Sequence, residues 1–157
     1  MTKITKKTTR EVRLAAKEEI LKLQGALLSK VNGVTVVDTH DTELFPLKHT
    51  FADGIYVRQM SMDKGSVVIG QIHNHLHVWF LLTGHISVAT NEIVEDYIAP
   101  CYVVAKPGTK RVIQANEDSI FVNIHKNPTN TQNIKELEAE LVSFDEAAFK
   151  KYITKTK

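Results

Sequence analysis

Three of the seven histidines in this 157-residue chain, His73, His75 and His77, occupy alternate positions in its most apolar stretch, between Gly70 and Gly84. Neutral imidazole is a common ligand of transition metals, so such a cluster could hold an ion. On one straight strand the three side chains would face the same way, with Cα atoms about 6.6 Å apart between neighbours and about 13 Å between the outer two. Only a neighbouring pair could then reach one ion. If the chain instead turns around Asn74-His75, His73 would end one strand, His77 would begin the next, and the two could converge.

Other histidines could complete a ligand set. His125 ends an apolar run, and His49 is a more distant candidate. A catalytic metal site needs about three protein ligands and an open position. We therefore expect His73 and His77 to be the core ligands, with His75, His125 or His49 as the third, for a divalent ion such as Zn, Fe, Ni or Mn. The alternative is that these side chains are hydrogen-bonded groups in a barrel mouth that bind no metal.

Arg111 indicates a different chemistry. A permanent cation beside a divalent ion is repulsive unless an anion lies between them, and a guanidinium among histidines suits a carboxylate or phosphate. A cavity for a small anionic molecule is therefore a second hypothesis, with Arg111 and Trp79 as ligand contacts. Two alternatives stay open: Arg111 could lie on the solvent face of its strand, and Trp79 could pack in the core.

The elements that must position these residues are mostly short strands. Turn signals such as Asp63-Lys64-Gly65 and Pro107-Gly108 separate them, and no helical period lies between them. This pattern predicts an antiparallel sandwich, barrel or jelly roll. The expected strands are 34–37, 55–62, 66–72, 77–83, 85–90, 102–105, 111–114 and 119–125.

Helical patterns are confined to the two ends of the chain. Thr8 and Glu11 form a capping box before an apolar stripe that continues to Leu28, so a helix is predicted over 9–31. Two short helices are expected after the strands. Their predicted N-caps are Asn130 or Thr131 for the first, and Ser143, in a capping box with Glu146, for the second.

Composition excludes several classes of protein. A hydrophobic fraction of 43% with 24% charged residues is ordinary for one soluble domain, and no apolar run is long enough to span a membrane. The single cysteine, Cys101, cannot form an internal disulfide, which favours a cytoplasmic protein. The net charge of +2 gathers as lysines at the two ends without aromatic interleaving, so we expect no nucleic-acid partner.

The histidine stretch resembles the first sequence motif of the cupin superfamily. Counting back from Gly84 places His77 where that motif has a glutamate, His73 at its second histidine and Gln71 at its first. The resemblance therefore implies that Gln71 also contacts the ligand. The second cupin motif is similar to residues 105–111, where Arg111 stands at the position of the last metal ligand.

The resemblance implies a mainly β protein: a single cupin-like jelly-roll β-barrel with an N-terminal helix and two short C-terminal helices. We expect a basic segment and amphipathic helix in 1–33, the barrel in 34–127 and a helical extension in 128–157. The strand 77–83 is apolar on both faces, so its outer face should lie under a helix or another subunit. Because cupin-like proteins are often dimers, we predict a homodimer or larger assembly.

A longer series of segments, from Phe51 to His125, also resembles small cupin-like proteins of bacteriophage genomes, which implies a viral origin and a location in the host cytoplasm. Two functions follow as hypotheses. The first is a protein that binds a divalent metal, a small anionic ligand or both, with the question of catalysis left open. The second is a structural protein of the virion, which would use the jelly roll to assemble with other virion proteins.

Overall fold

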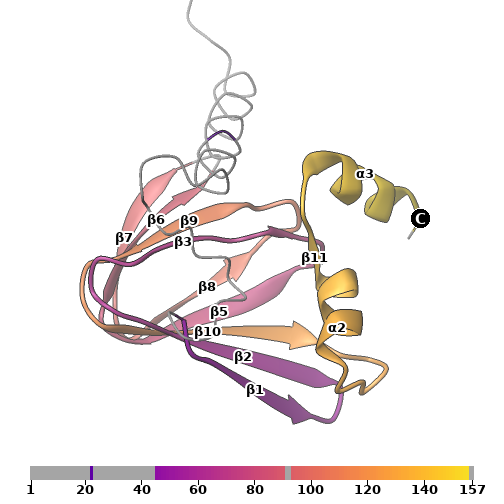
Figure 1. Cartoon of the computed structure of the whole chain (residues 1–157), viewed down its shortest axis with the longest axis horizontal. Coiled ribbons are helices and arrows are strands. Elements are labelled where there is room, and N and C mark those ends of the chain that lie inside the picture. The colour runs from indigo at the N-terminus through magenta and orange to yellow at the C-terminus, as the bar shows by residue number, and fades with distance from the viewer. Residues whose placement is uncertain (1–21, 23–44, 91–92, 156–157) are drawn as a thin grey trace, which may run out of the picture.

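The computed structural model describes residues 22, 45–90 and 93–155, and most of the chain between Leu47 and Lys126 forms strands (Figure 1). The predicted helix over 9–31, apart from Lys22, and the predicted strand 34–37 lie outside the described residues. So does most of the segment 1–33 that was expected to precede the barrel.

Nine of the strands form two antiparallel sheets (Figure 1). The five-stranded sheet has the order β1-β2-β10-β5-β8, and the four-stranded sheet has the order β3-β9-β6-β7. In the first, the strands are β1 (Leu47–Ala52), β2 (Ile55–Met62), β10 (Ser119–Lys126), β5 (His77–Thr83) and β8 (Cys101–Ala105). In the second they are β3 (Val67–Ile69), β9 (Arg111–Ala115), β6 (His85–Thr90) and β7 (Val94–Ile98).

The core lies between these two sheets. Side chains alternate along each strand, so one set from each sheet faces the other. From the five-stranded sheet come Trp79, Leu81 and Phe121, and from the four-stranded sheet come Ile86 and Ile113, all nearly inaccessible to solvent. Burial on this inner face is the main force that holds the sheets together, because apolar area removed from water is the dominant favourable term in folding.

The predicted jelly-roll architecture is confirmed, with one difference: the two sheets form separate ladders and do not close into a continuous barrel within the described residues. The predicted strand 66–72 is divided into β3 and a short β4 (Ile72–His73), which leaves the four-stranded sheet. Strands β1 and β7 were not predicted. β7 is an edge strand with mostly exposed residues, so it carries little of the apolar alternation by which strands are recognised.

The C-terminal extension packs beside one end of the sandwich (Figure 1). It contains α2 (Ile134–Leu141), the short strand β11 (Val142–Ser143), which pairs with β4, and α3 (Glu146–Lys155). Leu137 and Leu141 are buried against Tyr56 of β2. No helix in the described part of the chain has the length and apolar character needed to cross a membrane.

Both predicted caps of these helices were wrong. The N-cap of α2 is Asn133, whose side chain accepts a hydrogen bond from the amide of Lys135, while Asn130 instead accepts one from the amide of Gly54. Ser143 belongs to β11, and the amide of Ala148 at the start of α3 donates to Asp145. In each case a nearby polar residue was closer to the true first turn, and helix ends are the least certain part of a sequence-based assignment.

Candidate metal and anion site

One end of the space between the sheets is polar. The inward-facing positions near the start of β2 are Tyr56 and Arg58, and the β-ladder sets them opposite His125 and Asn123 at the end of β10. The beginning of β5 and of β9 lie at the same end and contribute His77 and Arg111. Farther along the same strands, inward positions such as Met60, Ile113 and Phe121 are apolar. The strand period of two therefore gives each strand a polar terminus and a core segment on one face.

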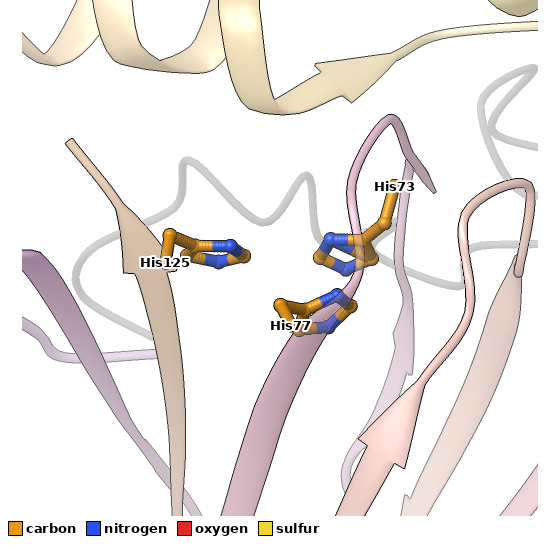
Figure 2. Close-up of side chains that lie close together, drawn as sticks. All are labelled: His73, His77 and His125. Atoms are coloured by element: carbon orange, nitrogen blue, oxygen red, sulfur yellow. The ribbon is translucent and has the colours of Figure 1, made fainter. Parts of the chain in front are cut away.

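His73, His77 and His125 converge in this polar end from three different strands, β4, β5 and β10 (Figure 2). One ligand nitrogen from each residue lies within 4.8 Å of the other two. The ring centroids are 3.9 Å apart for His73 and His77, and 4.9 Å apart for His77 and His125. All three side chains are buried. The expected convergence of His73 and His77 is thus present, with His125 as the third member.

A turn at Asn74 and His75 brings His73 and His77 together. The amide of Asn74 donates to the carbonyl oxygen of Leu141 at 2.8 Å, and its side chain donates to the carbonyl of Glu140. Ser143 donates to Oδ1 of Asn74 at 2.7 Å. The end of α2 and the strand β11 therefore hold the turn, which explains why the alternation of histidines does not continue as one straight strand.

Burial keeps the three histidines neutral. It lowers the pKa of His77 to about 4, with a further contribution from the charge of Arg111. It lowers the pKa of His125 to about 3, to which His77 and Arg111 add. The pKa of His73 lies well below its ordinary value, first through burial and then through Arg111. At neutral pH each ring is therefore a neutral imidazole with a lone pair on one nitrogen, which is the form that binds metals.

Arg111 is also in the cluster. Only 4% of its surface is exposed, and its Nη2 donates to Nε2 of His73 at 2.8 Å and to Nε2 of His77 at 3.1 Å. Its guanidinium carbon lies 6.0 Å from the ring of Trp79 and 5.8 Å from that of Phe121. Burial lowers the pKa of Arg111 to about 10, so it remains a cation at neutral pH. The alternative of a solvent-facing Arg111 is therefore excluded.

The contacts of Arg111 fix the tautomers of two histidines. A guanidinium has no acceptor, so both Nε2 atoms must accept and the proton of each neutral ring lies on Nδ1. For His77 this proton can be donated to the carbonyl oxygen of His75, 3.3 Å away. For His73, Nδ1 is buried without a hydrogen-bond partner. A buried donor without a partner costs about 1–3 kcal/mol, so a group that accepts a hydrogen bond from Nδ1 of His73 would be stabilised here.

A cavity of about 70 Å³ opens beside the cluster. A water needs roughly 10–15 Å³ of such space, so the cavity suits about five waters or a molecule of similar size. Polar lining comes from His73, Arg111, Asn123 and His125, among others, and apolar lining from residues such as Met60, Val68, Ile113 and Leu141. Nη1 of Arg111 and Oδ1 of Asn123 are both buried and without a hydrogen-bond partner.

The other candidate residues lie in three different places. Gln71 lines the cavity. Trp79 lies in the core against Phe121 and Tyr97, behind Arg111, and is not among the residues that line the cavity. His49 pairs with the hydroxyl of Tyr56 at 2.7 Å.

His75 does not join the three clustered histidines. Its Nε2 contacts the carbonyl oxygen of Glu140 at 3.1 Å and the hydroxyl of Tyr152 at 2.8 Å. Asn123 and Arg58 are cavity residues that the sequence did not single out. The sequence pattern could have identified both, because every second residue of a strand faces the same side. Asn123 therefore faces inward with His125, and Arg58 faces inward with Met60.

The donor set fits a divalent metal only in part. Three neutral imidazoles are suitable ligands for Zn²⁺ and its neighbours, with bonds of about 2.0–2.1 Å. In a tetrahedral site of that size the donor atoms would be about 3.4 Å apart, so the three rings must move closer together. In addition, Arg111 must leave Nε2 of His73 and His77 if these atoms are to bind the ion.

No protein-family model and no curated protein matches the sequence. Among solved structures the chain is similar to a cupin superfamily protein from Desulfitobacterium hafniense, at 9% identity over 59% of this chain and 84% of that one, with a TM-score of 0.44. It is also similar to KdgF from Halomonas sp., at 17% identity over 60% and 89% of the two chains, with a TM-score of 0.47. A cupin 2 conserved barrel domain protein from Salinispora arenicola gives 12% identity over 76% and 96%, with a TM-score of 0.46.

These likenesses concern the fold and say nothing about substrate or reaction. The resemblance to bacteriophage proteins, the cytoplasmic location and the homodimer stay predictions.

Proposed function

We propose that this chain is a cupin-like binding protein that holds one divalent transition metal through His73, His77 and His125, and a small anionic ligand beside Arg111. The observation that carries the metal is the set of three buried, neutral imidazoles whose ligand nitrogens lie within 4.8 Å of one another. Such a metal would supply Lewis acidity to a ligand in the cavity. The protein side chains around the metal would orient that ligand and exclude water from the cavity.

The buried charge of Arg111 favours an anionic ligand. Arg111 is a buried cation, and its described contacts are two neutral imidazoles and two aromatic rings, with no carboxylate among them. Taking a charge out of water without a counterion costs on the order of several kcal/mol in real proteins. An anionic ligand would recover this cost, so its binding would be favoured.

Metal content tests the first part of the proposal. The protein would be purified without a histidine tag and analysed by elemental analysis, alongside His73→Ala/His77→Ala. His75→Ala is the matched control, because His75 lies two positions from each target in the sequence but outside the cluster. We expect near-stoichiometric Zn, Fe, Ni or Mn in the wild type and the control, and loss of the metal from the double variant.

A wild type that is empty, and that takes up none of these ions when they are added, would overturn the metal proposal. The assembly hypothesis would then be the stronger one. Its own test is the size of the particle in solution, since a structural protein of a virion should form a defined oligomer.

A further inference from the structure

Arg111 and a metal ion cannot use the histidines at the same time. Each neutral imidazole has a single lone pair on Nε2, and Arg111 Nη2 donates to those of His73 and His77 at 2.8 and 3.1 Å. An ion bound through these atoms therefore requires the guanidinium to withdraw. In this structure, Arg111 is the cation that His73 and His77 bind.

The cavity beside the cluster provides room for a ligand that could bind the guanidinium of Arg111. Three residues that line it each have a buried polar atom without a hydrogen-bond partner: Nη1 of Arg111, Nδ1 of His73 and Oδ1 of Asn123. The first two are donors, because Arg111 has no acceptor and its contact places the proton of His73 on Nδ1. The third is an acceptor. The three residues come from β9, β4 and β10, which are far apart in the sequence.

These atoms define the ligand that would satisfy them. Two donors, one of them cationic, call for a carboxylate, whose geometry matches a guanidinium. Oδ1 of Asn123 calls for a donor on the same molecule, such as a hydroxyl. With space for roughly five waters, the cavity suits an acid of about five or six non-hydrogen atoms. The apolar lining from Val68, Ile113 and Leu141 can accept a short alkyl group.

We propose that the cavity binds a small 2-hydroxycarboxylate through Arg111 and Asn123, and that this ligand draws Arg111 away from His73 and His77 so that metal and carboxylate bind cooperatively. The carboxylate site stands on the unsatisfied atoms alone, whereas the cooperativity rests on the proposed metal function. Since coupling between two ligands is reciprocal, each must raise the affinity of the other by the same factor.

Binding to the metal-free protein tests the carboxylate site. Glycolate, acetate and glycolamide would be titrated by calorimetry in the presence of a chelator, with fluorescence of Trp79 as a second readout. Trp79 is the single tryptophan, 6.0 Å from the guanidinium of Arg111, so it should report a movement of that group. We expect glycolate to bind at least tenfold more tightly than acetate, which lacks the hydroxyl, and glycolamide, which lacks the charge, not to bind.

Two variants assign the contacts. Arg111→Met should abolish glycolate binding, with circular dichroism to verify that the variant is folded. Asn123→Leu, at a half-buried position that is easier to replace, should reduce the affinity for glycolate about tenfold and that for acetate less than twofold. Equal affinities for glycolate and acetate, or unchanged glycolate binding in Asn123→Leu, would overturn the proposed ligand class.

A metal titration tests the coupling. We expect saturating glycolate to raise the affinity for Co²⁺ at least tenfold in the wild type and to have no such effect in Arg111→Met, which should bind Co²⁺ more tightly without glycolate. Glycolate complexes Co²⁺ in solution, but this lowers the apparent affinity and cannot produce the expected increase. Affinity for Co²⁺ that glycolate leaves unchanged or lowers would refute the cooperativity.

The two proposals fail in different ways. If the protein binds Co²⁺ but not glycolate, the carboxylate site is wrong and the metal function stands. If it binds glycolate through Arg111 but takes up no metal in the wild type or in Arg111→Met, the metal function and the cooperativity are wrong and the carboxylate site stands.

Discussion

Nη2 of Arg111 lies 2.8 Å from Nε2 of His73, a contact between residues 38 positions apart in the sequence. In the sequence resemblance, Arg111 falls at the position of the last metal ligand of the second cupin motif, so a cation would replace a donor there. The contact orders the ring of His73, fixes its tautomer and keeps a guanidinium in the centre of the candidate site. Any ligand of this site has to compete with that contact or be accommodated beside it.

Acidification should destabilise the metal-free protein between pH 6.5 and about 4. The folded-state pKa values of His77 and His125 are lowered to about 4 and about 3, whereas an unfolded histidine titrates near 6.5. In this interval the unfolded chain binds more protons, so the free energy of unfolding falls as the pH falls, by about 1.4 kcal/mol per pH unit for each such histidine. Above pH 6.5 these groups should contribute no pH dependence.

Urea unfolding followed by Trp79 fluorescence at pH 7.5, 6 and 5, with a chelator present, measures this slope. His125→Asn should reduce it by about one proton, or about 1.4 kcal/mol per pH unit. A slope that is the same in the wild type and the variant would show that His125 is not held neutral by burial.

His75 should stabilise the C-terminal helices and not the metal. It links the β4–β5 turn to both, since its Nε2 contacts the carbonyl of Glu140 in α2 and the hydroxyl of Tyr152 in α3. We expect His75→Ala to cost about 1 kcal/mol of stability, as for a lost hydrogen bond, and to speed tryptic cleavage at the lysines of α3. Tyr152→Phe should have a similar effect on cleavage.

Limited proteolysis followed by mass spectrometry identifies the cleaved bonds. If cleavage in α3 is unchanged in both variants, this hydrogen-bonded link does not hold the helix. If metal content falls in His75→Ala, the assignment of His75 outside the ligand set is wrong.

Gly84 should be much less tolerant of a side chain than Gly54. Both have positive φ, +86° and +71°, so alanine is strained at either position by about 1 kcal/mol. A Cβ at Gly84 would also collide with the backbone and side chain of Ser119 and with the carbonyl of Asp118, whereas at Gly54 it would meet nothing within 4 Å. We expect Gly84→Ala to cost at least about 2 kcal/mol more than Gly54→Ala, since overpacking typically adds 1–3 kcal/mol.

Urea unfolding of the two variants gives the difference directly. Equal losses of stability would mean that β10 can shift away from the β5–β6 turn at little cost.

The outer face of the five-stranded sheet is where the predicted homodimer should form. Phe80 and Tyr102 pack against each other there, with ring centroids 5.6 Å apart, and Tyr102 is 66% exposed beside the exposed Val104. A second copy of the chain would remove this apolar surface from water. We expect Tyr102→Lys to lower the molar mass measured by light scattering.

Ile98→Lys is the matched control, because Ile98 is 71% exposed but belongs to β7 of the other sheet. It should leave the molar mass unchanged. A monomeric wild type would contradict the predicted homodimer, and an effect of Ile98→Lys alone would move the interface to the four-stranded sheet.

Several features were determined by the sequence itself. Alternation of apolar residues with turn signals predicted six of the strands, and the turn at Asn74 was foreseen as the way for His73 and His77 to meet. These are local properties, since the strand period of two and the preferences of turn residues act over a few positions. The same local reasoning was wrong about the helix caps, where several polar residues in a row compete for one role.

Only the tertiary structure decided which histidine joins that pair. Nothing local distinguishes His75, which turns toward Tyr152, from His125, which enters the cluster through the pairing of β10 with β5. Arg111 was equally ambiguous, because a shift of one residue in strand register would have placed it in solvent. Register and the packing of two sheets depend on contacts between distant segments, and these contacts placed Arg111, His73 and Asn123 around one cavity.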